Sequence, residues 1–344
     1  MQQFDNPLST DGFAFLEFAT QNKNTISNNF NNLGFTCVGS APNHDVSVFK
    51  QGQIIFFVNN SSDDNTKQFT DSHGDSTCSM GFYVADPKFA LTEAVKRGAT
   101  EYKVPNDSVW YNTPAIEGIG GTVIYFVDSS DSFLNKFNIS NNIYNDFGLQ
   151  YLDHVTHNVY RGNMVKWADF YTNIFGFRQI RYFDIDGKTT GLFSKAMTSA
   201  CGKIKIPLNE SKDDKSQIEE FLKEFNGEGI QHIALTSKDI FSSVAQINNS
   251  GVKLLETPDT YYELIENRLP NHNEDVAKLK KFGILIDGTT SPQRKLLLQI
   301  FTQNLLGPVF FEIIQRKGDE GFGEGNFKAL FDSIELDQMR RGVI

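Results

Sequence analysis

The chain has 344 residues and is acidic, with a formal net charge of −10 and a pI near 5.1. Its length accommodates two domains with cores of their own, and its 39% hydrophobic and 22% charged residues are ordinary for a globular protein. The acidic balance disfavours nucleic acid as a partner, and strand-length apolar runs without a signal-peptide pattern at the N-terminus predict neither a membrane span nor secretion.

Three cysteines, Cys37, Cys78 and Cys201, stand at wide and unrelated spacings. An odd number at such spacings argues against a disulfide framework and against a zinc site built from cysteines. A cytoplasmic, reducing location is therefore expected.

One order of predicted elements occurs twice along the chain. Residues 1–145 are expected to hold a strand at 13–18, a helix ending at 32–35, a hairpin around 54–58, a strand at 80–84, a helix ending at 96–99 and a strand at 121–127. Residues 146–344 are expected to hold a strand at 152–159, a helix ending at 173–177, strands at 190–197, 203–208 and 230–235, a helix running to 251 and a strand at 307–313. A Ser/Asn-rich stretch, 129–145, is expected to link them. We predict an α+β fold of tandem βαβββ modules in two domains, 1–145 and 146–344.

The C-terminal stretch indicates a functional site. In a strand, period-two alternation puts Phe310, Glu312 and Ile314 on one face, so a carboxylate lies among bulky apolar side chains. Such a carboxylate needs a proton, an arginine or a metal ion as partner. A glycine-rich turn follows, and then a predicted helix with Phe327 and Phe331 on one side. We expect this helix to close a pocket, and the 31 phenylalanines favour an aromatic ligand.

Two of the six histidines, His154 and His232, lie inside apolar strands. For either one alone, a hydrogen-bonded core histidine is the ordinary explanation. His154, His232 and Glu312, however, stand at matching places in three different strands of the same repeat. This pattern predicts a metal site.

Matching the two halves by their glycines places Phe18 opposite His154, Phe126 opposite Glu312, and about Gly81 opposite His232. None of these three is a metal ligand. The metal is therefore expected in the second half alone.

Two histidines and one carboxylate on separate strands suit non-haem Fe(II), because they leave three neighbouring positions open. Zinc remains an alternative from ligand type. Asp153 and His157 are one and three residues from His154, so on a regular strand they point to the opposite face and are not expected to be ligands.

Six motifs in order resemble the 4-hydroxyphenylpyruvate dioxygenase family over essentially the whole chain. They are Leu152-Asp-His154, Ile206-Pro-Leu-Asn-Glu210, Lys215-Ser-Gln-Ile-Glu-Glu220, Gly229-Ile-Gln-His-Ile-Ala-Leu235, Leu297-Leu-Gln-Ile-Phe-Thr302, and Phe311-Glu-Ile-Ile-Gln-Arg316 with the glycine-rich run to Phe327. The resemblance implies the vicinal-oxygen-chelate fold, with two half-barrel domains, a C-terminal lid helix, and Fe(II) in the second half.

The same resemblance implies roles for individual residues. It implies His154, His232 and Glu312 as iron ligands. The implied polar residues around the substrate are Ser194, Asn209, Gln217, Gln231 and Gln299, and the implied aromatic wall and lid are Phe301, Phe310, Phe322, Phe327 and Phe331. Gln231 directly precedes His232, so it reaches the substrate only where the strand is irregular. The loop after Asn209 is shorter than in relatives, which leaves the place of Gln217 open.

The implied reaction converts 4-hydroxyphenylpyruvate and O₂ to homogentisate and CO₂ in tyrosine and phenylalanine catabolism. A homo-oligomer, either a dimer or a tetramer, is expected. Three alternatives remain at this point: hydroxymandelate synthase, an extradiol dioxygenase, and a non-enzymatic binding protein of the same fold. Phe327 favours 4-hydroxyphenylpyruvate dioxygenase over hydroxymandelate synthase, which tends to carry a smaller aliphatic residue at this position.

Overall fold

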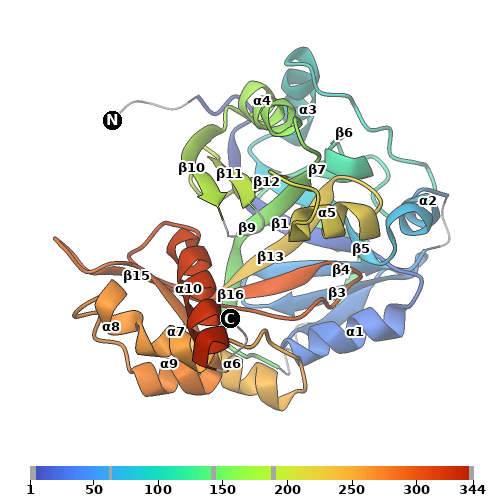
Figure 1. The fold of residues 1–344 in the computed structure, drawn as a ribbon. Helices are drawn as coiled ribbons and strands as arrows, with labels where there is room; N and C mark the ends of the chain where they lie inside the picture. Colours follow the sequence, from blue (N-terminus) through green and yellow to red (C-terminus); the bar gives the residue numbers. More distant parts are fainter. Residues whose placement is uncertain (1–4, 62–63, 141–144, 187–190, 341–344) are drawn as a thin grey trace.

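The computed structural model describes residues 5–61, 64–140, 145–186 and 191–340 (Figure 1). The elements of the first half are β1 (Thr10–Ala19), α1 (Lys23–Asn32), β2 (Thr36–Ser40), β3 (Val46–Gln51), β4 (Ile54–Asn59), α2 (Asp64–His73), β5 (Ser76–Val84), α3 (Pro87–Lys96), β6 (Ala115–Glu117), η1 (Ile119–Gly121), β7 (Val123–Val127), η2 (Ser132–Lys136) and β8 (Asn138–Ile139). These strands form one eight-stranded sheet, in the order β6-β7-β5-β1-β4-β3-β2-β8.

The second half repeats this plan with extra helices before the C-terminus. Its elements are β9 (Leu149–Val159), α4 (Met164–Phe175), β10 (Arg178–Asp186), β11 (Gly191–Thr198), β12 (Lys205–Ser211), α5 (Gln217–Glu224), β13 (Gly229–Ser237), α6 (Ile240–Asn249), α7 (Asp259–Glu263), α8 (Ile265–Arg268), α9 (Val276–Phe282), β14 (Leu285–Thr289), β15 (Lys295–Phe301), β16 (Phe310–Lys317) and α10 (Glu324–Arg340). The second sheet has the order β10-β11-β12-β9-β13-β16-β15-β14.

The pairing of strands confirms the predicted tandem βαβββ modules. At the centre of each sheet an antiparallel pair, β1–β5 or β9–β13, joins two modules. A parallel strand flanks it on each side: β4 and β7 in the first sheet, and β12 and β16 in the second. The first helix of each half ends at its predicted glycine, since Gly34 and Gly176 have φ values of 90° and 70°, which L side chains rarely adopt.

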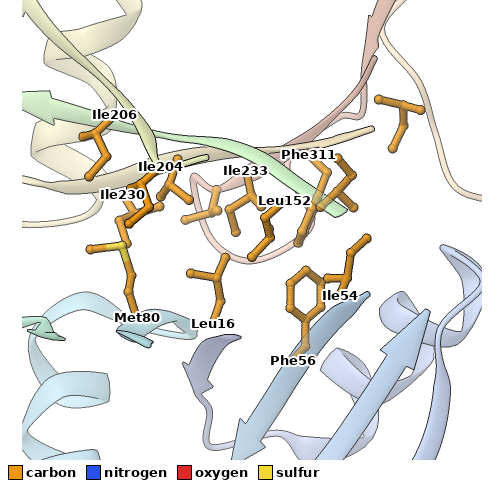
Figure 2. Packing of buried hydrophobic residues seen from close by; sticks show 14 of the residues in the cluster. Leu16, Ile54, Phe56, Met80, Leu152, Ile204, Ile206, Ile230, Ile233 and Phe311 are labelled. Atoms are coloured by element: carbon orange, nitrogen blue, oxygen red, sulfur yellow. The ribbon is translucent and has the colours of Figure 1, made fainter. Parts of the chain in front are cut away.

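The two halves share one hydrophobic core (Figure 2). Leu16, Phe56 and Met80 from the first sheet face Ile233 and Phe311 from the second. Hydrophobic side chains on one face of each sheet are thereby removed from water, which holds the halves together. The faces that point away from this core differ between the sheets. Aromatic rings cover that face of the first sheet, and polar side chains converge on that face of the second.

The first sheet carries aromatic rings where the second carries its candidate ligands. Strand register pairs Phe15 with Gly81 and Gly81 with Tyr125, and it pairs His154 with Ala234 and Ala234 with Glu312. Phe15 and Tyr125 therefore correspond to His154 and Glu312, and by the same register Ser79 corresponds to His232. Trp110 fills this space, with its ring 4.6 Å from Phe15 and 5.1 Å from Tyr125.

The predicted matches in the first half were therefore wrong by one to three positions. Phe18 and Phe126 belong to the core shared with the second half, so they lie on the face away from Phe15 and Tyr125. Glycine spacing alone could not locate a face, because one step along a strand moves a side chain across the sheet.

The expected linker 129–145 also differs. It contains η2 and the short strand β8, which pairs with β2 at the edge of the first sheet. Phe133 and Phe137 from this stretch are buried in the aromatic cluster around Trp110. These two rings hold a polar stretch against the domain, and residues 141–144 lie outside the described parts.

Among the helices in the described residues, none combines the length and the apolar character that crossing a bilayer requires.

Candidate metal centre

Three side chains from adjacent strands converge on the inner face of the second sheet. His154 lies on β9, His232 on β13 and Glu312 on β16. The Oε2 atom of Glu312 lies 3.2 Å from Nε2 of His154 and 3.6 Å from Nε2 of His232. The three ligand atoms all lie within 4.8 Å of one another, which is close enough for one metal ion to bind them together.

Each histidine is oriented from behind by the residue that precedes it. The Nδ1 atom of His154 lies 2.8 Å from Oδ1 of Asp153, and Nδ1 of His232 lies 2.9 Å from Oε1 of Gln231. Such partners fix the orientation of an imidazole ring and increase its basicity as a ligand. Both histidines therefore present Nε2 to the centre.

The local charges distinguish the two histidines. Burial lowers the pKa of His154, but hydrogen bonds to Asp153 and Glu312 outweigh it and raise the pKa above its ordinary value. For His232, burial and then the nearby charges of His154 and His157 lower the pKa well below its ordinary value. The neutral form, which binds metals, is therefore favoured for His232, whose Nε2 also lies 2.9 Å from Oγ1 of Thr156.

The donor set fits a divalent transition metal. Two imidazole nitrogens and one carboxylate oxygen leave coordination positions open, and this is the set that suits non-haem Fe(II). The side chains of His154 and Glu312 are 3% and 2% exposed, so an ion there would be shielded from water. A buried carboxylate beside two histidines also favours a cation energetically.

A buried ion pair stands behind this centre. Arg316 donates from Nε and Nη2 to both carboxylate oxygens of Asp153, at 2.8 and 2.7 Å. Burial opposes the charge on Asp153, but Arg316 and His154 hold the pKa of this carboxyl well below its usual range. Nη1 of Arg316 donates to the carbonyls of Asp319 and Gly321, which lead to α10. The ligand His154 is thus connected to the segment that precedes the last helix.

Gln299 connects the other side of the centre to α10. Its Nε2 donates to Oε1 of Glu312 at 2.8 Å, and its Oε1 accepts from Nδ2 of Asn326 at 2.7 Å. Gln299 and Asn326 are each 2% exposed. The amide of Gln299 is therefore held by protein groups on both sides.

Three of the expected phenylalanines surround the ligands. Phe310 stacks on His232 with ring centroids 4.9 Å apart, Phe301 lies edge-on to Phe310 at 6.0 Å, and Phe322 lies edge-on to His154 at 5.2 Å. These rings give the centre apolar walls that would suit an aromatic substrate.

Ser194 and Asn209 are neighbours on the inner face of the same sheet. Register pairs Ser194 with Asn209, and Asn209 with Asn158 of β9. Asn158 is fully buried, and neither polar atom of its amide has a partner within the described residues. An unpaired buried amide is costly, which makes Asn158 a candidate for contact with a ligand. Alternation from His154 could have indicated it, since both residues have the same parity on β9.

Gln217 and Phe327 do not reach the centre in this structure. Gln217 is exposed in the first turn of α5, and Phe327 is 43% exposed on α10. Consecutive residues on a helix are rotated by about 100°, so the burial of Asn326 turns Phe327 outward. The Phe331 side chain lies outside the described residues.

Sequence reasoning missed Asp153, Arg316 and Asn326 as residues of this site. Asp153 was expected to face away, and it does not point at the centre, but it holds the far nitrogen of His154. The alternation of a strand shows only which face a side chain takes. It gives no sign of contacts that pass behind a ligand or arrive from a distant helix.

Comparisons with known proteins agree with this geometry. Residues 151–264 match the model of the glyoxalase/bleomycin resistance protein/dioxygenase superfamily, and residues 4–146 match the model described as hydroxyphenylpyruvate dioxygenase, N-terminal. The chain is 53% identical over 347 residues to a 4-hydroxyphenylpyruvate dioxygenase of Legionella pneumophila (strain Corby), covering 99% of both chains. It is 48% identical to one of Pseudomonas aeruginosa, covering 98% of this chain and 97% of the relative.

A solved structure of a related enzyme has a similar fold. A mutant of 4-hydroxymandelate synthase from Streptomyces coelicolor superposes with a TM-score of 0.80 at 25% identity, covering 96% of this chain and 99% of the other.

The repeated modules and the site on the inner face of one sheet are those of the glyoxalase and dioxygenase superfamily, which has the vicinal-oxygen-chelate fold. Within it, the near-complete matches to its relatives are decisive. The chain belongs to the 4-hydroxyphenylpyruvate dioxygenase family.

Proposed function

We propose that this chain converts 4-hydroxyphenylpyruvate and O₂ to homogentisate and CO₂, with Fe(II) held by His154, His232 and Glu312. The convergence of these three ligand atoms within 4.8 Å carries the proposal. Bound Fe(II) would supply the redox chemistry that activates O₂, and its open positions suit the 2-oxo acid of the substrate. Residues 1–145 would form a domain without metal ligands, because Trp110 fills the place in this half that corresponds to the ligand site of the second half.

The protein's own residues would bind and shield the substrate. The rings of Phe301, Phe310 and Phe322 suit the face and edge of an aromatic ring, and they exclude water from the ligands. Ser194 and Asn209 offer hydrogen bonds farther along the inner face. Gln231 and Gln299 would act through the ligands that they orient, His232 and Glu312.

The last helix would serve as a lid. The glycine-rich segment before α10 includes Gly323, with φ of 77°. Arg316 donates a hydrogen bond to this segment, and Gln299 accepts one from the first turn of α10. Phe327 on this helix would cover the substrate ring, and we propose the same for Phe331. Gln217 would approach from α5.

Hydroxymandelate synthase chemistry is the second candidate, because the superposed 4-hydroxymandelate synthase mutant has the same overall fold. It would use the same substrate and oxygenate the benzylic carbon in place of the ring. A binding protein without catalysis has less support, since such proteins do not need three converging ligands with oriented partners.

The deciding experiment is anaerobic loading of the purified chain with Fe(II), followed by addition of 4-hydroxyphenylpyruvate and O₂ and chromatographic identification of the product. Homogentisate, with one CO₂ released per O₂ consumed, is the expected result. Hydroxymandelate would favour the second candidate. Iron loading without O₂ consumption would overturn both.

We further propose a cytoplasmic homo-oligomer, a dimer or a tetramer, acting in tyrosine and phenylalanine catabolism. The odd number of cysteines, three at wide and unrelated spacings, supports a reducing location. Sedimentation of the purified chain would test the oligomeric state.

A further inference from the structure

A chain of buried hydrogen bonds runs from Glu312 to the last helix and beyond. Gln299 donates to Oε1 of Glu312, and Asn326 donates to Gln299. The hydroxyl of Tyr261 lies 2.7 Å from Oδ1 of Asn326, and Nη2 of Arg268 donates to this hydroxyl at 2.9 Å. Glu312, Gln299, Asn326 and Tyr261 are each at most 2% exposed, so water does not compete for these bonds.

The partners fix the direction of every bond in this chain. The Tyr261 oxygen accepts from the backbone N–H of Ile286 at 2.9 Å and from Arg268, so its single proton remains to be donated. Burial raises the pKa of Tyr261 to about 12, which keeps that proton in place at neutral pH. The carbonyl of Ile286 already accepts from Arg268 at 2.7 Å, and Oδ1 of Asn326 is the nearer acceptor for Tyr261.

This direction determines how both amides face. Because Oδ1 of Asn326 accepts from Tyr261, its NH₂ group must face Gln299. Oε1 of Gln299 accepts that bond, so the NH₂ group of Gln299 must face Glu312. The chain thus runs from the cation Arg268 to the anion Glu312, and hydrogen bonds aligned in this way strengthen one another.

We propose that Asn326 is a positioning residue, which through Gln299 fixes Glu312 for metal binding and so links docking of α10 to metal affinity. This inference rests on the proposed Fe(II) site. Gln299 occupies Oε1 of Glu312, and Oε2 is left to face His154 and His232. An Oε2 held at this place is ready to bind a metal without further ordering.

The start of α10 is built for this close contact. A Cβ atom at Gly323 would lie 1.7 Å from Oε1 of Gln299, so a glycine is required where the segment crosses the amide. The backbone N–H of Gly325 donates to Oδ2 of Asp287 at 2.7 Å, and Oδ1 of Asp287 lies 3.5 Å from Nη1 of Arg268. Helix docking and the hydrogen-bond chain therefore use the same residues. By reciprocity, a metal that is bound more tightly when α10 is docked also stabilises the docked helix.

The test measures how fast iron leaves the Fe(II)-loaded full chain for a chromogenic chelator under anaerobic conditions. Asn326→Ala is expected to speed release by up to about tenfold, the lower end for loss of a direct partner of a metal ligand, because Gln299 stands between Asn326 and Glu312. Tyr261→Phe should shift release in the same direction by a smaller factor, because it removes the donor that orients Asn326. Ser333→Ala is the matched control. Ser333 is fully buried in the same helix, and among the described residues its hydroxyl donates to the carbonyl of Leu330 in that helix, so release should match the wild type.

Asn326→Asp separates positioning from packing. Aspartate has nearly the shape of asparagine but cannot donate to Gln299, so the NH₂ group of Gln299 turns toward it and the oxygen turns toward Glu312. Iron release should then be at least as fast as in Asn326→Ala, and the visible spectrum of the Co(II)-loaded variant should differ from that of the wild type. A packing role predicts the opposite order, with aspartate milder than alanine.

The outcomes are distinguishable from failure of the proposed function. A wild-type chain that binds no Fe(II) would overturn the metal site itself. A wild type that holds iron, with Asn326→Asp and Tyr261→Phe releasing it at the wild-type rate, would overturn only the role of Asn326. Circular dichroism establishes whether each variant is folded. If Asn326→Ala does not fold, Tyr261→Phe, which removes only one hydroxyl, is used in its place.

Discussion

Gln231 and His232 are neighbours on β13, and the amide oxygen of the first lies 2.9 Å from Nδ1 of the second. On a regular strand they would point to opposite faces. The register of β13 against β9 shifts between Ile230 and His232, so Gln231 occupies an irregular position that lets its side chain reach its neighbour. The irregularity therefore has a function, which is to orient a candidate ligand.

This contact predicts a graded effect on metal binding. Gln231→Leu should weaken Fe(II) binding by about tenfold, because His232 loses the acceptor that holds its ring. Gln231→Glu keeps an acceptor at the same place and should bind Fe(II) at least as well as the wild type. Anaerobic Fe(II) titration measures both. Equal affinity for the Leu and Glu variants would show that His232 is oriented by its other contacts, the Thr156 hydroxyl and the Phe310 ring.

The pair of Asp153 and Arg316 predicts a large effect on stability. Arg316→Ala removes both hydrogen bonds from Arg316 to the buried carboxylate of Asp153 and leaves Lys205, with Nζ 3.6 Å from Oδ2, as its remaining basic neighbour. The free energy of unfolding should fall by about 3 kcal/mol, the lower end for breaking a buried ion pair. Adding Asp153→Asn to this variant should recover part of the loss, because the buried charge that has lost its closest cation is removed. The control is Lys203→Ala, which breaks an exposed pair with Asp11 and should change stability by less than about 1 kcal/mol. Urea unfolding measures all three, and a loss for Arg316→Ala no larger than for the control would contradict this account.

Iron retention should separate the three ligands from the nearby His157. His154→Ala, His232→Ala and Glu312→Ala are each expected to lose most bound iron, because each removes one of three protein donors. His157 faces the opposite side of β9, where its Nε2 lies 2.7 Å from the hydroxyl of Tyr171, so His157→Gln should keep its iron. Metal analysis of the purified variants is the measurement. Full iron content in Glu312→Ala would refute the assignment.

Much of this site could be predicted because strand periodicity and repeat position are local properties of the sequence. His154, His232 and Glu312 each stand in a clean apolar strand, and period-two alternation with a repeated element order was enough to group them. Features that depend on three-dimensional packing were not accessible. The register shift at Gln231 and the burial of Asn326 in place of Phe327 come from contacts between segments far apart in the chain.

The first half shows the same limit. The absence of metal ligands from this half stays a prediction, and the aromatic residues that fill the corresponding place could not be predicted. Trp110 lies outside the strands and Phe133 lies in η2, so strand periodicity does not describe them. Those rings fill the place that corresponds to the metal centre.

His157 should make the fold sensitive to acid. Burial lowers the pKa of His157 to about 3, against about 6.5 in the unfolded chain. As the pH falls below 6.5, the unfolded chain takes up a proton that the folded chain does not, so stability declines between pH 6.5 and pH 3. At pH 5.5 the loss from this one group is about 1.4 kcal/mol relative to pH 7.5.

His157→Gln removes this titration and keeps an acceptor for Tyr171. Its free energy of unfolding should therefore fall less than that of the wild type between pH 7.5 and pH 5.5. His44→Gln, at a partly exposed loop position, serves as the control and should retain the wild-type dependence. Urea unfolding at the two pH values decides the matter, and identical pH dependence for His157→Gln and the wild type would exclude His157 as the cause.

Phe327 offers a test of how the substrate ring is held. Its ring is 43% exposed in the first turn of α10, one residue from Asn326, and an aromatic substrate bound against Phe301 and Phe310 would give this ring an apolar surface to cover. Because Phe327 is so exposed, Phe327→Ile should leave stability within about 1 kcal/mol of the wild type and iron content unchanged.

A smaller aliphatic side chain at position 327 should leave the substrate ring freer to rotate, so that the benzylic carbon competes with the ring for oxygen. We therefore expect Phe327→Ile to raise KM for 4-hydroxyphenylpyruvate and to divert a measurable share of product from homogentisate to hydroxymandelate or another product without side-chain migration. Chromatographic analysis after a single turnover measures the share. Phe327→Tyr, which keeps the ring, is the matched control and should give homogentisate alone. An isoleucine variant with wild-type KM and homogentisate as its sole product would mean that Phe327 remains on the outer side of the lid throughout the reaction.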